Sequence, residues 1–160
     1  MNLWDKHKKH DKTNRQINPQ LHFDTEIEKE FKHFAIAFCK WLRQNYEFPV
    51  VLNIYFVNTY KIRLLNGLMA YGSFRWYPKR SPRICIPAKI EPELLSELSK
   101  EDIYEMILSS MVHEITHYYQ WTDNLKQNNA VSEKQANYYR YRIIDNFFDQ
   151  TKYDFNGKTL

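Results

Sequence analysis

SSMVHEITHYYQW, residues 109–121, places His113 and His117 four positions apart, with Glu114 directly after the first histidine. Residues four apart lie on the same face of an α-helix, so both imidazoles can point at one ion. Zinc needs this arrangement from its first two ligands, and a carboxylate beside them can act as a general base. The stretch therefore predicts a zinc-binding helix in which Glu114 takes a proton from water.

Three pairs of residues have the spacing of a capping box, in which a helix-starting side chain is followed three positions later by an acid or amide. The pairs are Thr25 with Glu28, Ser99 with Asp102, and Ser132 with Gln135. Apolar side chains recur at helical intervals after each pair. We therefore expect an N-terminal helix to about residue 45, a long helix that carries the motif, and a C-terminal helix that begins at Ser132.

Three stretches between the first two helices read as strands, because they are rich in β-branched and aromatic residues. They are residues 48–57, 68–77 and 83–87, and Asn66–Gly67 before the second of them marks a turn. Prolines around 83–87 favour a short strand near an edge. The order of elements predicts an α+β fold with a three-stranded, mainly antiparallel sheet.

The length of 160 residues fits one domain, and the net charge of +4 is unevenly spread. Residues 1–23 are polar and lack periodicity, so we expect a flexible basic N-terminal arm there and a folded domain over 24–160. The basic excess over residues 1–19 also fits contact with nucleic acid. No stretch is apolar enough to span a membrane or to serve as a secretion signal, which predicts a cytoplasmic protein without a membrane partner.

A catalytic zinc site normally has three protein ligands, so a third must be found. No histidine follows His117, and the histidines upstream fall in the expected arm or first helix. Glu133 is the favoured ligand, because a helix that follows the motif after a loop can fold back and place a first-turn carboxylate over the metal. Asn137, one turn further on, is a candidate to orient a metal-bound histidine through a hydrogen bond.

Asp123 is the alternative third ligand. It stands six residues after His117, as the acid does in metalloproteases with an extended HExxHxxGxxD pattern. Those chains have a glycine where this one has Gln120, and the glycine permits the turn that brings the acid back.

With His113, Glu114, His117 and SEKQAN at 132–137, the chain resembles small zincin metallopeptidases. The Glu133-x-x-Ala136-Asn137 run is similar to the ExxxD element of gluzincins, especially the ImmA/IrrE-like domains. Residues 82–121 are also similar to the SprT-like domain, and the whole resemblance covers about residues 48–148. The departures are Asn137 in place of the usual aspartate, and the absence of both a downstream third histidine and a cysteine-rich zinc ribbon.

The resemblance implies a zincin-like metallopeptidase domain with His113, His117 and Glu133 as ligands of Zn²⁺ and Glu114 as general base. It also implies that a protein or peptide substrate pairs antiparallel with an edge strand, for which residues 83–86 are the candidate. The leading hypothesis is a cytoplasmic, gluzincin-like zinc peptidase that hydrolyses a peptide bond with a zinc-activated water.

Two other hypotheses stay open. One is a zinc-stabilised binding or regulatory protein with an unused or degenerate site, docking on nucleic acid through the basic arm. The other is a metal-free interaction domain in which the motif is accidental. The sequence identifies neither the substrate nor the oligomeric state.

Overall fold

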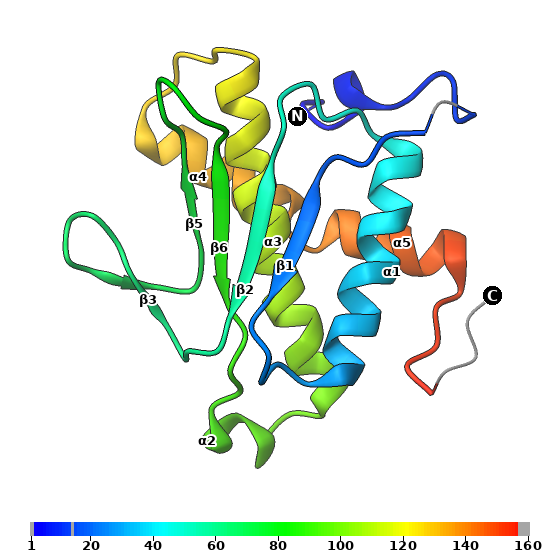
Figure 1. Cartoon of the computed structure of the whole chain (residues 1–160), viewed down its shortest axis with the longest axis vertical. Coiled ribbons are helices and arrows are strands. Elements are labelled where there is room, and N and C mark those ends of the chain that lie inside the picture. Colours follow the sequence, from blue (N-terminus) through cyan, green and yellow to red (C-terminus); the bar gives the residue numbers. More distant parts are fainter. Residues whose placement is uncertain (1, 14, 157–160) are drawn as a thin grey trace.

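The computed structural model describes residues 2–13 and 15–156, and it has the expected α+β class (Figure 1). In chain order the elements are the 3₁₀ helix η1 (Asp5–His7), β1 (Gln20–Phe23), α1 (Lys29–Asn45), β2 (Asn53–Val57), β3 (Ile62–Arg63), β4 (Met69–Ala70), β5 (Ser73–Arg75), β6 (Arg83–Pro87), α2 (Pro92–Leu95), α3 (Lys100–Thr122), α4 (Asn129–Tyr139) and α5 (Arg142–Thr151). The motif lies in the second half of α3.

The sheet differs from the predicted three-stranded, mainly antiparallel one. It has four strands in the order β1-β2-β6-β5, with β1, β2 and β6 mutually parallel and β5 antiparallel to β6. A separate two-stranded hairpin, β3 and β4, closes around the predicted turn, where Gly67 has a φ of 85°. The predicted strand over 68–77 is divided at Gly72 into β4 and β5, and β6 lies inside the sheet rather than near its edge.

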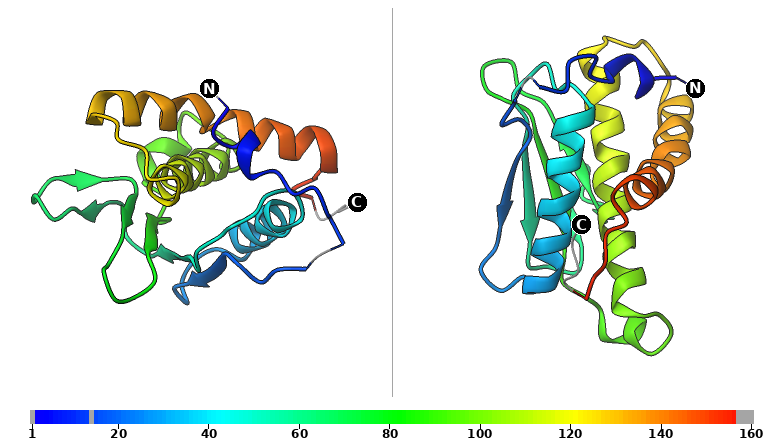
Figure 2. Two further views of the ribbon diagram at one scale, coloured as in Figure 1. Left: turned by 90° about the horizontal axis from the view of Figure 1, so that it is seen from above. Right: turned by 90° about the vertical axis from the view of Figure 1, so that its right-hand side faces the viewer.

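Three layers build the domain (Figure 2). One face of the sheet packs on α1 and α3, and α4 and α5 cover the other side of these two helices. Alternate residues of the central strands are fully buried against the helices, namely Ile54, Phe56, Ile84 and Ile86. The outer face of the sheet is only partly buried, as the alternating burial of β2 and β6 records.

Where the structure describes the segment predicted as a flexible arm, residues 1–23, several of its residues pack on the domain. Leu3 and Trp4 are each 1% exposed, and the indole Nε1 of Trp4 donates to Thr116 Oγ1 on α3 at 3.0 Å. Gln20–Phe23 forms β1 and extends the sheet beside β2. Two apolar residues and a four-residue strand are too short to show a period in the sequence, so their tertiary role was hidden.

One of the three predicted capping boxes marks a helix start. The Ser99 side chain accepts from the Asp102 N–H at the start of α3. Glu28 rather than Thr25 precedes α1, without a side-chain cap. Helix α4 begins three residues before Ser132, capped by Asn128, and a break after Tyr139 separates it from α5. Among the described residues, no helix combines the length and apolar character needed to cross a membrane.

Candidate metal centre

Helix α3 holds the two motif histidines at the wall of a cleft. Most other side chains in the second half of α3 are buried, whereas those of His113 and His117 are 15% and 17% exposed. Their Nε2 atoms lie 3.2 Å apart, as expected for residues one turn apart that point the same way. The helix therefore presents two imidazole nitrogens to a single point.

Glu133 reaches that point from the next helix. Its Oε2 lies 3.0 Å from His113 Nε2 and its Oε1 lies 2.9 Å from His117 Nε2. Helix α4 starts earlier than predicted, so Glu133 stands in its second turn rather than its first. The expected fold-back of this helix over the motif is nevertheless present, because α4 packs along α3.

The three side chains fit a tetrahedral zinc ion. Zinc binds nitrogen and oxygen at about 2.0–2.2 Å, so tetrahedral angles place two ligand atoms about 3.3 Å apart. The two carboxylate oxygens of Glu133 lie 3.0 Å and 2.9 Å from the two imidazole nitrogens, which are 3.2 Å apart, and with one ligand atom from each residue all three atoms lie within 4.8 Å of one another. Two imidazoles and a carboxylate also match the donor set of catalytic zinc sites with an open fourth position. No other group of three such side chains is found among the described residues.

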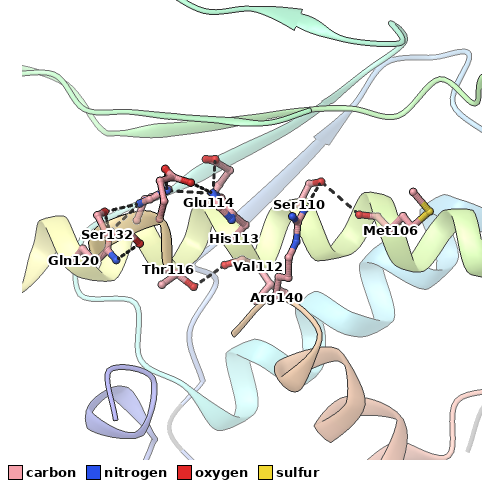
Figure 3. A network of polar contacts seen from close by, with 11 residues as sticks. Met106, Ser110, Val112, His113, Glu114, Thr116, Gln120, Ser132 and Arg140 are labelled. Carbon is pink, nitrogen blue, oxygen red and sulfur yellow. Dashed lines mark hydrogen bonds and ion pairs between the residues drawn. The ribbon is translucent and has the colours of Figure 1, made fainter. Parts of the chain in front are cut away.

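Gln120 fixes the orientation of His117, and Figure 3 shows Gln120 beside Ser132. Its Oε1 lies 2.8 Å from His117 Nδ1 and also accepts from Ser132 Oγ at 2.6 Å. Its Nε2 donates to the Ser132 carbonyl at 3.0 Å and to Gln135 Oε1 at 2.8 Å. With Nδ1–H of His117 donating to Gln120, the lone pair of Nε2 is left for a metal.

His113 is supported differently. Its Nδ1 is buried and has no hydrogen-bond partner among the described residues. Burial and the neighbouring His117 lower the pKa of His113 to about 4, against the opposing influence of Glu133. Asn137, predicted to orient a histidine, is exposed on α4, and its side chain acts to raise the pKa of His113. A neutral imidazole is the form that binds a metal.

Glu114 is enclosed beside the two histidines. Its Oε1 lies 3.9 Å from His113 Nε2, and its side chain is 8% exposed. Burial, followed by the charge of Glu133, raises the pKa of Glu114 to about 8, while Arg140 acts to lower it. Gly72 lies against it from the loop between β4 and β5, where an added Cβ would stand 3.2 Å from Glu114 Cγ. The position of Glu114 thus depends on a small residue across the cleft.

The alternative ligand Asp123 is engaged elsewhere. It lies at the C-terminal end of α3, and its Oδ1 is 3.0 Å from His7 Nε2. Of the other upstream histidines, His22 lies 2.9 Å from Asn53 Oδ1 and stacks on Tyr55, and His10 and His33 are exposed. Glu133 rather than Asp123 is therefore the acid that meets the histidine pair.

The cleft in front of these side chains has a volume of about 640 Å³. Its walls come from α3, from α4 and from the chain that runs from β4 into β5. Arg140, just after α4, also lines it and donates from Nη2 to Ser110 Oγ at 3.2 Å (Figure 3). The sequence interpretation missed Arg140, Gly72 and the role of Gln120. For Gln120 a signal was present, since it follows His117 by three positions on the same helix face.

Comparison with protein-family models, curated proteins and solved structures finds no match for this chain. The case for its function therefore rests on the chemistry of the cleft.

Proposed function

We propose that this protein is a zinc-dependent peptidase of the zincin type. The observation that carries the proposal is the convergence of His113, His117 and Glu133, whose candidate ligand atoms lie within 4.8 Å of one another next to a buried Glu114. A bound zinc ion supplies a Lewis acid that polarises a carbonyl and lowers the pKa of a water molecule to about 7.

Glu114 is the general base of the proposed reaction. The raised pKa of Glu114 makes its carboxylate a better proton acceptor than that of an exposed glutamate. The positive charge of Arg140 acts to lower this pKa and so favours the ionised form. Glu114 takes the proton of the attacking water and then delivers it to the leaving amine. The enclosure by Gly72 and α3 keeps bulk water from competing for that proton.

The proposed docking edge for the peptide is β5 rather than residues 83–86. Strand β5 ends the four-stranded sheet, whereas β6 is paired on both sides by β2 and β5. Ser73 and Phe74 of β5 line the same cleft as His113 and Glu114. An extended peptide that pairs with the free edge of β5 would pass directly in front of the histidines, as β-augmentation requires.

The test combines metal analysis with cleavage assays on the full chain. We expect about one zinc per chain, lost on His113→Ala or His117→Ala. For Glu114→Gln we expect retained zinc and a loss of peptide hydrolysis by at least about 100-fold, the scale of a general base. A folded, unchelated protein without zinc would refute the proposal.

The same Glu114→Gln comparison separates the peptidase from a zinc-stabilised binding protein. If the native chain and Glu114→Gln both bind zinc and both hydrolyse peptides only at the background rate, the result favours the zinc-stabilised binding protein. The packing of Leu3 and Trp4 in the core leaves less of residues 1–19 free to act as a docking arm.

A further inference from the structure

A second cavity, separate from the metal cleft, lies on the outer face of the sheet. It has a volume of about 230 Å³ and is lined by Arg63, Arg75 and Arg83 with Ile62, Ser73, Tyr77 and Cys85. The three arginines come from three different strands, β3, β5 and β6. No carboxylate lines this arginine pocket.

The three guanidinium groups have no acidic partner among the described residues, since none of the ion pairs there involves them. Arg83 lies over the ring of Tyr55 at 4.3 Å. Burial raises the pKa of Cys85 in this pocket; Arg83 and Arg75 act to lower it, and Asp24 adds a smaller contribution that raises it. The Asp24 carboxylate already accepts a hydrogen bond from the Asn58 N–H. The pocket therefore holds uncompensated positive charge.

Strand β5 connects this pocket with the metal cleft. Ser73 lines both cavities. Phe74 points inward, where its ring packs against Tyr118 and Trp121 of α3, so its neighbours Ser73 and Arg75 face outward. Side chains directly opposite each other on paired strands share a face. A peptide paired with β5 would therefore direct alternate side chains toward the arginine pocket.

We propose that the arginine pocket is a substrate subsite for an anionic side chain, a carboxylate or a phosphate, of the peptide. This inference rests on the proposed peptidase function and on β5 as the docking edge. Arginine binds both groups through paired N–H donors, and its planar fork suits such a side chain. The cavity is smaller than typical small-molecule sites, which fits a single side chain.

The surroundings favour a peptide over single-stranded nucleic acid. Nucleic-acid grooves of this kind offer open aromatic faces on which bases stack. Here the ring of Tyr55 is stacked by His22 at 4.5 Å and approached by Arg83, and Tyr77 carries Arg80 at 4.0 Å. Both aromatic rings near the pocket are thus already occupied by side chains of the protein.

The first experiment reads the substrate preference. The zinc-loaded full chain is incubated with a peptide library prepared from a cell lysate, and the cleaved sites are sequenced by mass spectrometry. We expect acidic or phosphorylated residues to be enriched at one fixed position near the cleaved bond. The Arg75→Gln/Arg83→Gln double variant should lose this enrichment while it keeps its bound zinc.

Two controls sharpen this result. Arg15→Gln removes an exposed arginine outside the pocket and should leave the preference unchanged. Phosphatase treatment of the library separates the two anions, because it abolishes a preference for phosphate and preserves one for carboxylate. Cleavage without any acidic preference, or a preference that persists in the double variant, overturns the subsite.

The second experiment does not require cleavage. Fluorescence anisotropy measures binding to the zinc-loaded Glu114→Gln variant of two random peptide pools, which carry glutamate or glutamine at a fixed central position. We expect the glutamate pool to bind about tenfold more tightly, an advantage lost with Arg75→Gln/Arg83→Gln.

Equal binding of the two pools refutes the subsite whether or not peptides are cleaved. Preferred, arginine-dependent binding of a single-stranded oligonucleotide would refute it as well. If the native protein cleaves no peptide but the glutamate pool still binds more tightly, the peptidase function is refuted and the anion subsite is retained.

Discussion

The metal cleft and the N-terminal corner, which consists of Leu3, Trp4 and His7 with their contacts, both depend on α3 but use it differently. At the cleft, the Nε2 atoms of His113 and His117 lie beside each other and beside the Glu133 carboxylate, in a group that could hold a metal ion. At the corner, Thr116 and Asp123 of α3 are matched by Trp4 and His7. The cleft could bind a metal ion, whereas the polar groups of the corner are paired with other groups of the protein. Substitutions in the two regions should therefore have separable effects.

The largest effect is expected at the corner. Trp4 is 1% exposed, and the centroid of its ring lies 5.1 Å from the ring centroids of both Tyr46 and Tyr119. Trp4→Ala should lower the free energy of unfolding by about 3–5 kcal/mol, because it leaves a large cavity. Urea denaturation measures this loss.

Zinc affinity provides the contrast for the same variant. At urea concentrations where Trp4→Ala is still folded, its zinc affinity should equal that of the native chain. Ile17→Ala is the matched control, since Ile17 lies in the same N-terminal segment and is 76% exposed. A fall in zinc affinity without unfolding would show that the two regions are coupled.

Glu133→Ala should give the opposite pattern. The Glu133 side chain is 56% exposed and touches both histidines, so its removal costs little packing but deletes the proposed third ligand. We expect zinc affinity to fall by more than about 100-fold, beyond the loss for an outer-sphere partner. Chelator competition measures the affinity, and the stability of the zinc-free protein should be nearly unchanged.

Lys134→Ala is the control for this variant, because Lys134 is an exposed neighbour on α4. Unaltered zinc affinity in Glu133→Ala would mean that the third ligand lies elsewhere, and Asp123→Ala would then be the next variant to measure.

Gln120 is a residue of the cleft whose polar groups, like those of the corner, are hydrogen-bonded within the protein. Gln120→Ala removes the partner of His117 Nδ1 and the link to Ser132 and Gln135. We expect zinc affinity to fall about tenfold, as for other groups that orient metal-bound histidines. The matched variant Gln135→Ala removes one hydrogen bond of Gln120 and leaves its contact with His117. An equal loss of affinity in both variants would argue against a direct effect on the imidazole.

The sequence predicted those parts of the site that depend on local spacing. The shared face of His113 and His117 and the Ser99 cap require only the geometry of a single helix. The approach of Glu133 was anticipated because a helix after a short loop tends to fold back, although α4 starts earlier than the pattern suggested.

Contacts between distant segments could not be predicted in this way. Strand β1 is recognisable only once β2 lies beside it, and Trp4 acquires its role from Thr116, more than a hundred positions away. Gln120 stands where the HExxHxxGxxD pattern has a glycine, but its function depends on the position of Ser132 in the folded chain. The arginine pocket brings together side chains from β3, β5 and β6, and the sequence does not show that these side chains meet.

The smallest predicted effect concerns Tyr46 in the corner and the response to alkaline pH. Burial, followed by the charge of Asp5, raises the pKa of Tyr46 from 10.0 to about 12. Between pH 10 and pH 12 the unfolded chain releases the phenol proton and the folded chain keeps it, so stability falls as pH rises.

Tyr46→Phe removes this titration. Its stability loss between pH 10 and pH 12, from urea denaturation, should be smaller than the native loss by about 1 kcal/mol, allowing for partial solvent screening. Other buried tyrosines, such as Tyr104 and Tyr118, also have raised pKa values, so a steep fall should remain in the variant. Identical profiles for Tyr46→Phe and the native chain would mean that Tyr46 ionises alike in the folded and unfolded states, which would contradict the enclosed corner.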